Sequence, residues 1–311
     1  MSRIRTVPRA VDLLQTAKTQ MPIVGIGTVV VDHVVELSEF PAVDTKAEVV
    51  NSWQQVGGPV PVALSTAAFY GSTTTFCGRW GNDAHGEFIR ETLTGRSVAT
   101  IADTPGEDWA SGFAQVWVDQ SSGLRTIAYS RGQFPLLDDT ITRRIDFNHP
   151  TVLHLDGWAA EAAIATARIV NQNGGTVVLD AGSLKPGMDR LLPHVDILIA
   201  SQLFQQSWFG VDRATDSQLF QLGPTRIITT LGAEGARWLS RDQSLFEPGI
   251  SVQAVDTNGA GDIFAGAVLH ATELGLEPSE TLKFANQVAG FSCGHRGNHT
   301  LPAISPVMAS E

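Results

Sequence analysis

The stretch that decides the fold is Val255-Asp256-Thr257-Asn258-Gly259-Ala260-Gly261-Asp262-Ile263-Phe264, a glycine-rich turn that leads directly into a helical pattern. Gly259 and Gly261 let the backbone turn tightly and approach a ligand closely, and the free N–H groups of the first helical turn form an anion site. Asp262 lies in that turn, where the helix dipole favours its ionised form, so it is available as a base. The stretch therefore predicts a phosphoryl-transfer site; the alternative is a structural acid at a helix start.

On either side of this turn, short β-branched runs alternate with helical stretches rich in Ala and Leu. The strands are expected at residues 23–31, 73–78, 151–155, 176–179, 197–200 and 227–230, and the helices at 62–69, 159–173, 263–274 and 280–293. Apolar strands that are each followed by a helix indicate a parallel sheet covered on both faces. The predicted fold class is α/β.

Two regions, at about residues 34–50 and 112–130, alternate polar and apolar residues without an intervening helix. We expect them to form antiparallel strands of a small second sheet, with a hairpin turn at Ser121-Ser122-Gly123. One face of such a small sheet would be left exposed unless it packs on something else. A position as a lid over an active site, or a contact in a dimer, would bury that face.

The domain organisation is expected to be simple. Residues 22–311 are interpreted as one main domain with an inserted lid, preceded by an extension at residues 1–21. This extension contains four basic residues and only one acidic residue, Asp12. We expect an extra helix on the domain surface; a transit peptide is the alternative.

Composition excludes several classes of protein. The 311 residues include 21 Lys and Arg against 32 Asp and Glu, a net charge of −11, which argues against a nucleic-acid partner. No run approaches the roughly 18 apolar residues of a membrane span, so we expect a soluble protein with no membrane partner. The two cysteines, Cys77 and Cys293, show no CxxC spacing. Neither a disulfide framework nor a zinc site is indicated, and a cytoplasmic location fits.

A family resemblance joins these observations. The stretch from Asp256 to Asp262 resembles the signature of the ribokinase-like (PfkB) family of carbohydrate kinases, and further segments resemble the family's motifs in the family's order, between about residues 23 and 302. These segments are Gly25 to Asp32, Gly57-Gly58-Pro59, Gly78 to Gly86, and Thr230 to Gly235. The chain is most similar to ketohexokinases and sulfofructose kinases within the family. The resemblance implies a three-layer α/β/α fold with a small β-sheet lid.

The resemblance also implies roles for individual residues. Asp262 would be the base, with the backbone of Gly259, Ala260 and Gly261 as the anion hole. The sugar would be bound by Asp32, Gly57, Gly58 and Asp156. The nucleotide would be bound by Arg125, Thr230, Gly232, Gly235 and Asn286, and a monovalent cation by the segments at Asp256 and residues 294–298 through backbone carbonyls.

Four of these assignments compete with simpler interpretations. Asp32 could be a solvated acid at a strand end, and Asp156 could form a turn before Gly157. Arg125 could be a solvated hairpin charge, and Asn286 a residue on a helix surface.

Three departures from the family pattern limit the substrate. Val62 stands where many members carry a sugar-binding Asn, and Val30 stands at a ribokinase-type Asn. Ser201 and Phe204 replace the two outer residues of an NxxE motif linked to magnesium and phosphate, so these two positions are not credited with a metal role. Ribose is therefore expected to be a poor substrate.

The resemblance predicts an ATP-dependent kinase that phosphorylates a hydroxymethyl group of a monosaccharide, with a ketose-type acceptor favoured. The cofactors would be ATP and Mg²⁺, with K⁺ a further candidate, and the chain would form a homodimer through the lid. A nucleoside kinase of the same fold and a catalytically silent sugar-binding protein are the alternatives. A dinucleotide site at Gly25-Ile26-Gly27 is disfavoured, because the third glycine of that fingerprint is absent.

Overall fold

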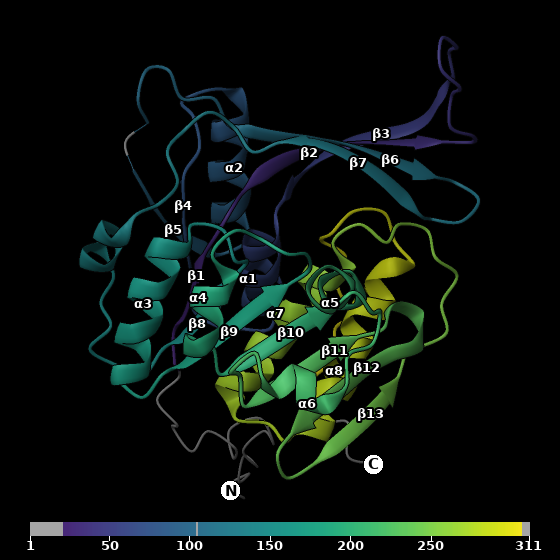
Figure 1. Ribbon diagram of the computed structural model, residues 1–311. Coiled ribbons are helices and arrows are strands. Elements are labelled where there is room, and N and C mark those ends of the chain that lie inside the picture. The colour runs from purple at the N-terminus through teal and green to yellow at the C-terminus, as the bar shows by residue number, and fades with distance from the viewer. Residues whose placement is uncertain (1–20, 104, 307–311) are drawn as a thin grey trace, which may run out of the picture.

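A computed structural model describes residues 21–103 and 105–306 of the chain. Within these residues, nine strands form the central sheet in the order β13-β12-β11-β10-β9-β8-β1-β4-β5 (Figure 1). All neighbours are parallel except β11–β12 and β12–β13. The strands are β1 (Ile23–Ile26), β4 (Thr74–Gly78), β5 (Val98–Ala102), β8 (Val152–Leu155), β9 (Thr176–Ala181), β10 (Ile197–Ser201), β11 (Arg226–Thr230), β12 (Gly235–Ser240) and β13 (Ser244–Pro248).

Helices cover both faces of this sheet, and each face has its own apolar core. One core is packed by α1 (Pro59–Phe69), α2 (Ala84–Gly95), α7 (Ala260–Leu274) and α8 (Pro278–Cys293). The other is packed by α3 (Ala160–Gln172), α4 (Met188–Leu191), α5 (Gln202–Phe209) and α6 (Asp216–Phe220). Short 3₁₀ turns occur at Asp139–Arg144, Leu192–His194 and Gly232–Glu234. The predicted three-layer α/β/α architecture is confirmed.

The buried strands follow from their composition. The first strand consists of Ile, Val, Gly and Ile, all buried, as expected for a strand with helices on both faces. The helix α8 begins at a Pro, after a capping box between Glu277 and Glu280, and α7 ends at Gly275 in a left-handed conformation. These are the usual start and stop signals of helices.

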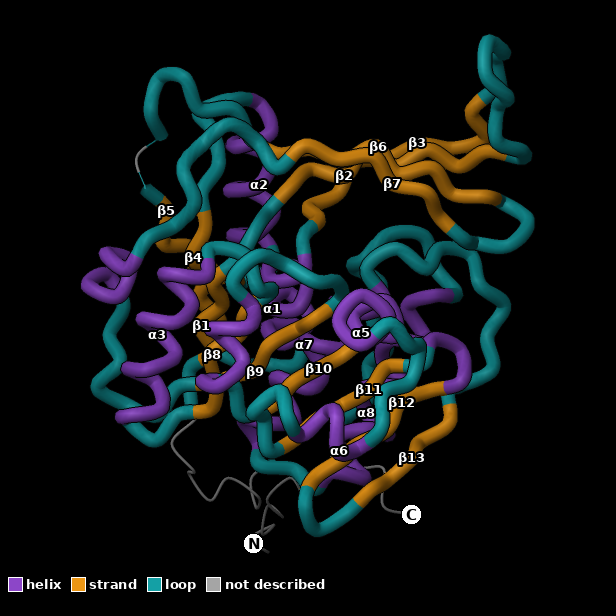
Figure 2. The backbone as a smooth tube through the Cα atoms, in the orientation of Figure 1, coloured by secondary structure: helices purple, strands orange, loops and turns teal. Residues whose placement is uncertain are grey.

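The lid is a four-stranded sheet in the order β3-β2-β6-β7, which lies across the top of the molecule in Figure 2. Its strands are β2 (Val30–Leu37), β3 (Val49–Gly57), β6 (Gly112–Asp119) and β7 (Arg125–Ser130). The predicted region 112–130 and its hairpin turn are confirmed. The region 34–50 is shifted, because residues 38–48 form a loop and the strands extend to Val30 and Gly57. The prediction of purely antiparallel pairing was wrong, since the central pair β2–β6 is parallel.

The predicted strand at residues 23–31 is two strands. The chain leaves the central sheet after Ile26, where the backbone N–H of Thr28 donates to the Asp156 carboxylate instead of to a neighbouring strand. Gly27 permits this departure, because a Cβ there would lie 2.5 Å from Val60 and 2.6 Å from Asp156. The chain then enters the lid at Val30.

Several elements were not predicted from the sequence, namely β5, the two antiparallel strands β12 and β13 at one end of the sheet, and the helices α2, α4, α5 and α6. The expected helix in the N-terminal extension falls at residues 1–20, outside the described residues. In the part of the chain that is described, no helix is long and apolar enough to cross a membrane.

Candidate active site

The predicted anion site lies at the start of α7. Gly259 caps the helix with a φ of 80°, a left-handed conformation that favours glycine. Gly261 is exposed, and a Cβ built on it would meet no other atom within 4 Å. The N–H groups of Gly261 and Asp262 belong to the first helical turn, which lacks intrahelical acceptors. The turn therefore offers backbone donors beside open space.

The Asp262 side chain stands among other carboxylates. Burial and the nearby charges of Asp180, Asp32 and Asp156 raise the pKa of Asp262 well above its usual value, while Arg125 partly opposes them. The expectation that the helix dipole keeps this acid ionised was therefore incomplete, because burial and like charges outweigh the dipole. No described residue makes a hydrogen bond to this carboxylate. It is free to accept the proton of a bound hydroxyl, and a raised pKa makes it a stronger base.

Asp32 is the third residue of the lid strand β2 and not the end of the first strand, so the prediction of its position was wrong. Its carboxylate is buried and accepts hydrogen bonds from Asn258 Nδ2 at 3.0 Å and Gln55 Nε2 at 3.3 Å. Burial raises the pKa of Asp32 to about 6, against the effect of these two hydrogen bonds. The alternative of a solvated strand-end acid is excluded.

The Gly-Gly turn packs directly against Asp32. A Cβ on Gly57 would lie 2.3 Å from the Asp32 carboxylate, so only glycine leaves room for this acid. Gly58 caps α1 with a φ of 101°. The turn and the acid, 25 residues apart in sequence, thus form one side of the candidate sugar site.

Asp156 follows β8 and is fully buried. It accepts hydrogen bonds from the backbone and hydroxyl of Thr28 at 2.8 and 2.9 Å, and from the Trp158 backbone N–H at 2.9 Å. The last hydrogen bond joins the side chain of Asp156 to the backbone two residues later, as in an Asx turn. The interpretation of Asp156 as a turn-forming residue is therefore correct. A contact with the sugar stays a prediction.

Asp180, which is not among the predicted site residues, lies beside Asp156. Strands β8 and β9 pair in parallel with Leu155 opposite Leu179, so the acids that follow these residues meet at one sheet edge. Burial and the charge of Asp156 raise the pKa of Asp180 to about 7. Burial lowers the pKa of the neighbouring Lys185, although both acids act in the opposite direction.

The tip of the lid touches the glycine-rich stretch. Thr257 donates to the Gly123 carbonyl from its backbone N–H at 3.2 Å and from its hydroxyl at 3.0 Å. Arg125 Nη1 donates to the Thr257 hydroxyl at 3.3 Å. Arg125 is exposed, but its charge acts on Asp262 and Asp256. It is therefore a hairpin residue held next to the candidate site, and its contact with a nucleotide stays a prediction.

The Asp256 carboxylate is held by two hydrogen bonds from the backbone. It accepts hydrogen bonds from the backbone N–H groups of Asn258 at 2.8 Å and Gly297 at 3.0 Å, which tie the turn to the 294–298 loop. The two predicted cation-binding segments thus lie side by side. In the described part of the chain, no cluster of three His, Cys, Asp or Glu side chains could hold a metal ion alone.

Four of the five predicted nucleotide residues lie at the β11–β12 turn and on α8, and the fifth, Arg125, lies on the lid strand β7. Thr230 ends β11, Gly232 follows with a φ of 58°, and Gly235 opens β12 with a φ of 115°. Asn286 is buried on α8 and donates its amide to the carbonyls of Glu247 at 2.9 Å and Pro248 at 3.2 Å. It is not a residue of the helix surface, and it fastens the end of β13 to α8.

The role of three further polar residues in holding Asp32 was not predicted. Gln55 and Asn258 hold Asp32, and Asn298 holds Gln55 by donating its backbone N–H to Gln55 Oε1 at 3.2 Å. Their sequence signals were weak: Asn258 lies inside the quoted glycine-rich stretch, and Gln55 stands two residues before Gly57. An amide next to a glycine turn is common, so neither position stood out.

Together these residues suit the transfer of a negatively charged group to a hydroxyl. Backbone donors lie beside open space at the start of α7, Arg125 is held nearby by its hydrogen bond to Thr257, and the carboxylate of Asp262, with its raised pKa, stands in the same helical turn. This donor set and the space above Gly261 fit an anionic phosphate chain. The fold and site define a small-molecule phosphotransferase.

The chain belongs to the pfkB family of carbohydrate kinases, whose model matches residues 20–304. It is 27% identical over 292 residues to a ribokinase of Arabidopsis thaliana, covering 89% of this chain and 77% of that protein. A solved structure of Arabidopsis thaliana ribokinase complexed with ribose and ATP is 26% identical, with a TM-score of 0.72 over 89% of this chain and 94% of that one. An adenosine kinase from Sinorhizobium meliloti shares the fold at 18% identity, with a TM-score of 0.76 over 93% and 98% of the two chains.

The acid cluster predicts a pH-dependent stability. Asp180 has a raised pKa when folded, so the folded state binds more protons than the unfolded state between pH 3.8 and about 7, and stability falls as the pH rises through that window. Asp180→Asn should therefore raise the melting temperature by a few degrees at pH 8 and by nothing near pH 3.5.

The measurement is a pair of thermal melts at each pH. Asp189→Asn, at an exposed position of α4, is the control and should leave both melts unchanged. An equal effect of Asp180→Asn at both pH values would contradict the predicted cost of ionising Asp180.

Proposed function

We propose that this pfkB-family kinase transfers the γ-phosphoryl group of ATP to a hydroxymethyl group of a monosaccharide, with a ketose-type acceptor favoured. One observation carries the proposal: Asp262, a carboxylate without a hydrogen-bond partner among the described residues and with a raised pKa, stands in the same helical turn as the open backbone donors of Gly261. Base and anion hole are thus within one turn of each other, as in-line transfer requires.

In this mechanism, Asp32 and Asp156 orient the acceptor through its hydroxyls. Asp262 takes the proton of the reacting hydroxyl, and the N–H groups at the start of α7 stabilise the charge on the migrating group. Arg125 holds the phosphate chain from the lid side. When bound, ATP would supply the phosphoryl group and Mg²⁺ would neutralise part of the charge of its phosphates.

A monovalent cation is also proposed. The segments at Asp256 and residues 294–298 lie together, which supports a K⁺ site formed by their backbone carbonyls. Its role would be to stabilise the turn that carries Gly259. Turnover measured in K⁺, Na⁺ and Tris buffers tests this role.

The proposed reaction is tested by screening acceptors for ADP release with ATP and Mg²⁺. The panel contains ketoses, ribose, deoxyribose, anionic sugar analogues and nucleosides. Turnover on a ketose supports the proposal, and preference for a nucleoside moves the assignment to the alternative kinase. No turnover on any acceptor, with ATP still bound, would favour a catalytically silent sugar-binding protein.

Ribose is predicted to be a poor acceptor. Val62 is buried on α1, close enough to α7 that its Cγ1 lies 3.8 Å from where a Gly259 Cβ would stand. A ribose hydroxyl placed against Val62 would lose its hydration without gaining a partner, at a cost of about 1–3 kcal/mol. We expect kcat/KM for ribose to be at least tenfold below that of the best acceptor.

The variant Val62→Asn supplies the missing amide and should narrow that gap, whereas Val62→Leu, which adds no amide at the same position, should not. If ribose is the best acceptor of the wild-type chain, the inference from Val62 is wrong.

A homodimer through the lid is the second predicted property. Apolar side chains on both faces of the lid are partly exposed, among them Trp117 at 41%, Ile127 at 43% and Tyr129 at 64%. A second copy of the lid would cover this area. Light scattering across a concentration series should give twice the mass of 33.2 kDa, and a strictly monomeric mass at micromolar concentration would contradict the prediction.

A further inference from the structure

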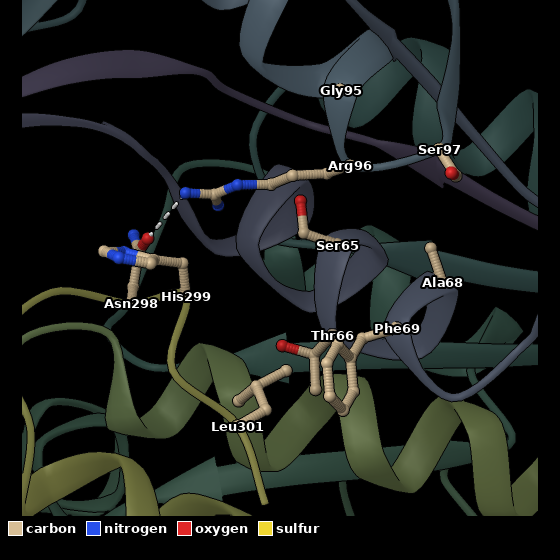
Figure 3. Close-up of a pocket in the computed structure, with 10 residues that line it drawn as sticks. All are labelled: Ser65, Thr66, Ala68, Phe69, Gly95, Arg96, Ser97, Asn298, His299 and Leu301. Carbon is tan, nitrogen blue, oxygen red and sulfur yellow. Dashed lines mark hydrogen bonds between the residues drawn. The ribbon is translucent and has the colours of Figure 1, made fainter. Parts of the chain in front are cut away.

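A cavity of about 380 Å³ lies outside the site described above. Three segments form it: the C-terminal half of α1, the turn that follows α2, and residues 298–301 (Figure 3). The mechanism proposed for the kinase uses none of its side chains apart from the hydrogen bonds of Asn298. The cavity therefore needs its own explanation.

Arg96 gives this cavity a positive charge. Its side chain extends across the cavity towards Asn298 and His299, and Nη2 donates to Asn298 Oδ1 at 3.3 Å (Figure 3). Its Nη1 is buried and has no acceptor among the described residues. None of the described lining residues is acidic. A buried guanidinium donor without an acceptor is unfavourable, and an anion would satisfy it.

The opposite wall suits hydroxyl groups. The Ser65 hydroxyl donates to the Pro61 carbonyl at 2.7 Å, and the Thr66 hydroxyl donates to the Val62 carbonyl at 3.0 Å. Since both protons are engaged inside α1, the two oxygens remain as acceptors. A ligand with an anionic group for Arg96 and free hydroxyls for these oxygens would satisfy the cavity, which describes a sugar phosphate.

Asn298 connects the cavity with the candidate sugar site. It accepts from Arg96, donates its backbone N–H to Gln55, and donates its side-chain amide to the Val56 carbonyl at 2.8 Å. Gln55 in turn holds Asp32. Two residues thus separate the guanidinium from the acid expected to bind the acceptor.

We propose that this cavity is a regulatory site for a small sugar phosphate, bound by Arg96 and coupled to acceptor binding through Asn298 and Gln55. An anion bound to Arg96 Nη1 leaves Nη2 bonded to Asn298. The ligand therefore restrains the chain of hydrogen bonds that runs from Arg96 through Asn298 and Gln55 to Asp32. The coupling is favourable and reciprocal. This second part rests on the proposed function, whereas binding at the cavity does not.

Binding is tested by calorimetry of the full chain with ribose 5-phosphate as the probe. A non-hydrolysable ATP analogue at saturation blocks the kinase site, because its γ-phosphate takes the place of a product phosphate. We expect one site per chain and binding at least tenfold weaker in Arg96→Gln. Inorganic phosphate should bind more weakly than ribose 5-phosphate, and neutral ribose should not bind in this way.

Arg125→Gln is the matched control, since it removes one arginine from the kinase site. It should leave the binding of ribose 5-phosphate unchanged once the analogue is again saturating. Ala68→Glu, which places an acid at the cavity while keeping Arg96, should weaken binding too. Melting curves confirm that each variant is folded. Absence of binding, or a loss confined to Arg125→Gln, overturns the proposal.

Coupling is tested with the best acceptor of the panel. Ribose 5-phosphate at saturation should lower the KM of that acceptor about fivefold in the wild type and not in Arg96→Gln. An unchanged KM despite binding overturns the coupling. If no acceptor is turned over, the proposed function fails, while the calorimetric result still decides whether the cavity binds its ligand.

Discussion

Replacing Asp262 by Asn is expected to reduce kcat by about 10²–10⁴-fold, because the amide cannot accept the hydroxyl proton. Folding should not suffer. The carboxylate accepts no hydrogen bond from the described residues, and burial raises its pKa, so a neutral side chain of the same shape removes an unfavourable charge. The melting temperature at pH 8 should be equal to or above that of the wild type, and ATP affinity should be nearly unchanged.

The measurements are turnover with the best acceptor, calorimetry with ATP, and a melting curve. In the wild type, kcat/KM should decline on the acidic side at a pH above the ordinary range of an aspartate, since Asp262 must be deprotonated to act. Undiminished turnover in a folded Asp262→Asn enzyme would refute the assignment of the base.

Gly261→Ala tests the anion hole. A Cβ there meets no atom within 4 Å, so the methyl group enters the space above the first turn of α7 without disturbing the fold. That space is where the migrating phosphoryl group is proposed to pass. We expect kcat to fall about 10²–10³-fold, comparable to the loss of one oxyanion-hole donor, with an unchanged melting temperature.

Gly95→Ala is the matched control, because its Cβ also meets nothing within 4 Å, at the end of α2. Gly95 lines the cavity of Arg96, so turnover is compared without added sugar phosphate, and under that condition the variant should leave it unchanged. Normal turnover in Gly261→Ala would mean that the phosphoryl group passes elsewhere.

The sequence predicts the central architecture well, because buried parallel strands and amphipathic helices produce local patterns that propensity and burial reinforce. The prediction from sequence was wrong where contacts between distant residues determine the ends or the pairing of a strand. The run from Ile23 to Val31 is mostly apolar, yet it divides into two strands, since the Asp156 carboxylate, distant in sequence, accepts the Thr28 N–H. Strands β12 and β13 were missed because polar or turn-favouring residues interrupt their sequences, Gly-Ala-Arg-Trp-Leu-Ser and Ser-Leu-Phe-Glu-Pro.

In the candidate site, too, the local features were predicted from the sequence and the tertiary contacts were not. The turn at Gly259–Gly261 and the base at Asp262 are local features of one stretch, and they were located from it. The acid cluster is not local. Asp180 reaches Asp156 through the pairing of two strands, and Asp32 reaches Asn258 across 226 residues. A pKa that depends on such neighbours cannot be predicted from the sequence around the titrating residue.

The packing around Asp32 has a practical consequence for redesigning the acceptor preference. Gly57 has no space for any side chain beside the Asp32 carboxylate, and Gly27 has none between Val60 and Asp156. A mutagenesis library that varies these glycines would yield mostly misfolded chains. Val62 packs in the core beside α7 and Val30 packs against the apolar cluster of the lid, and the side chains of both contribute apolar contacts. Directed evolution towards a new sugar should therefore randomise residues 30 and 62 and keep the glycines fixed.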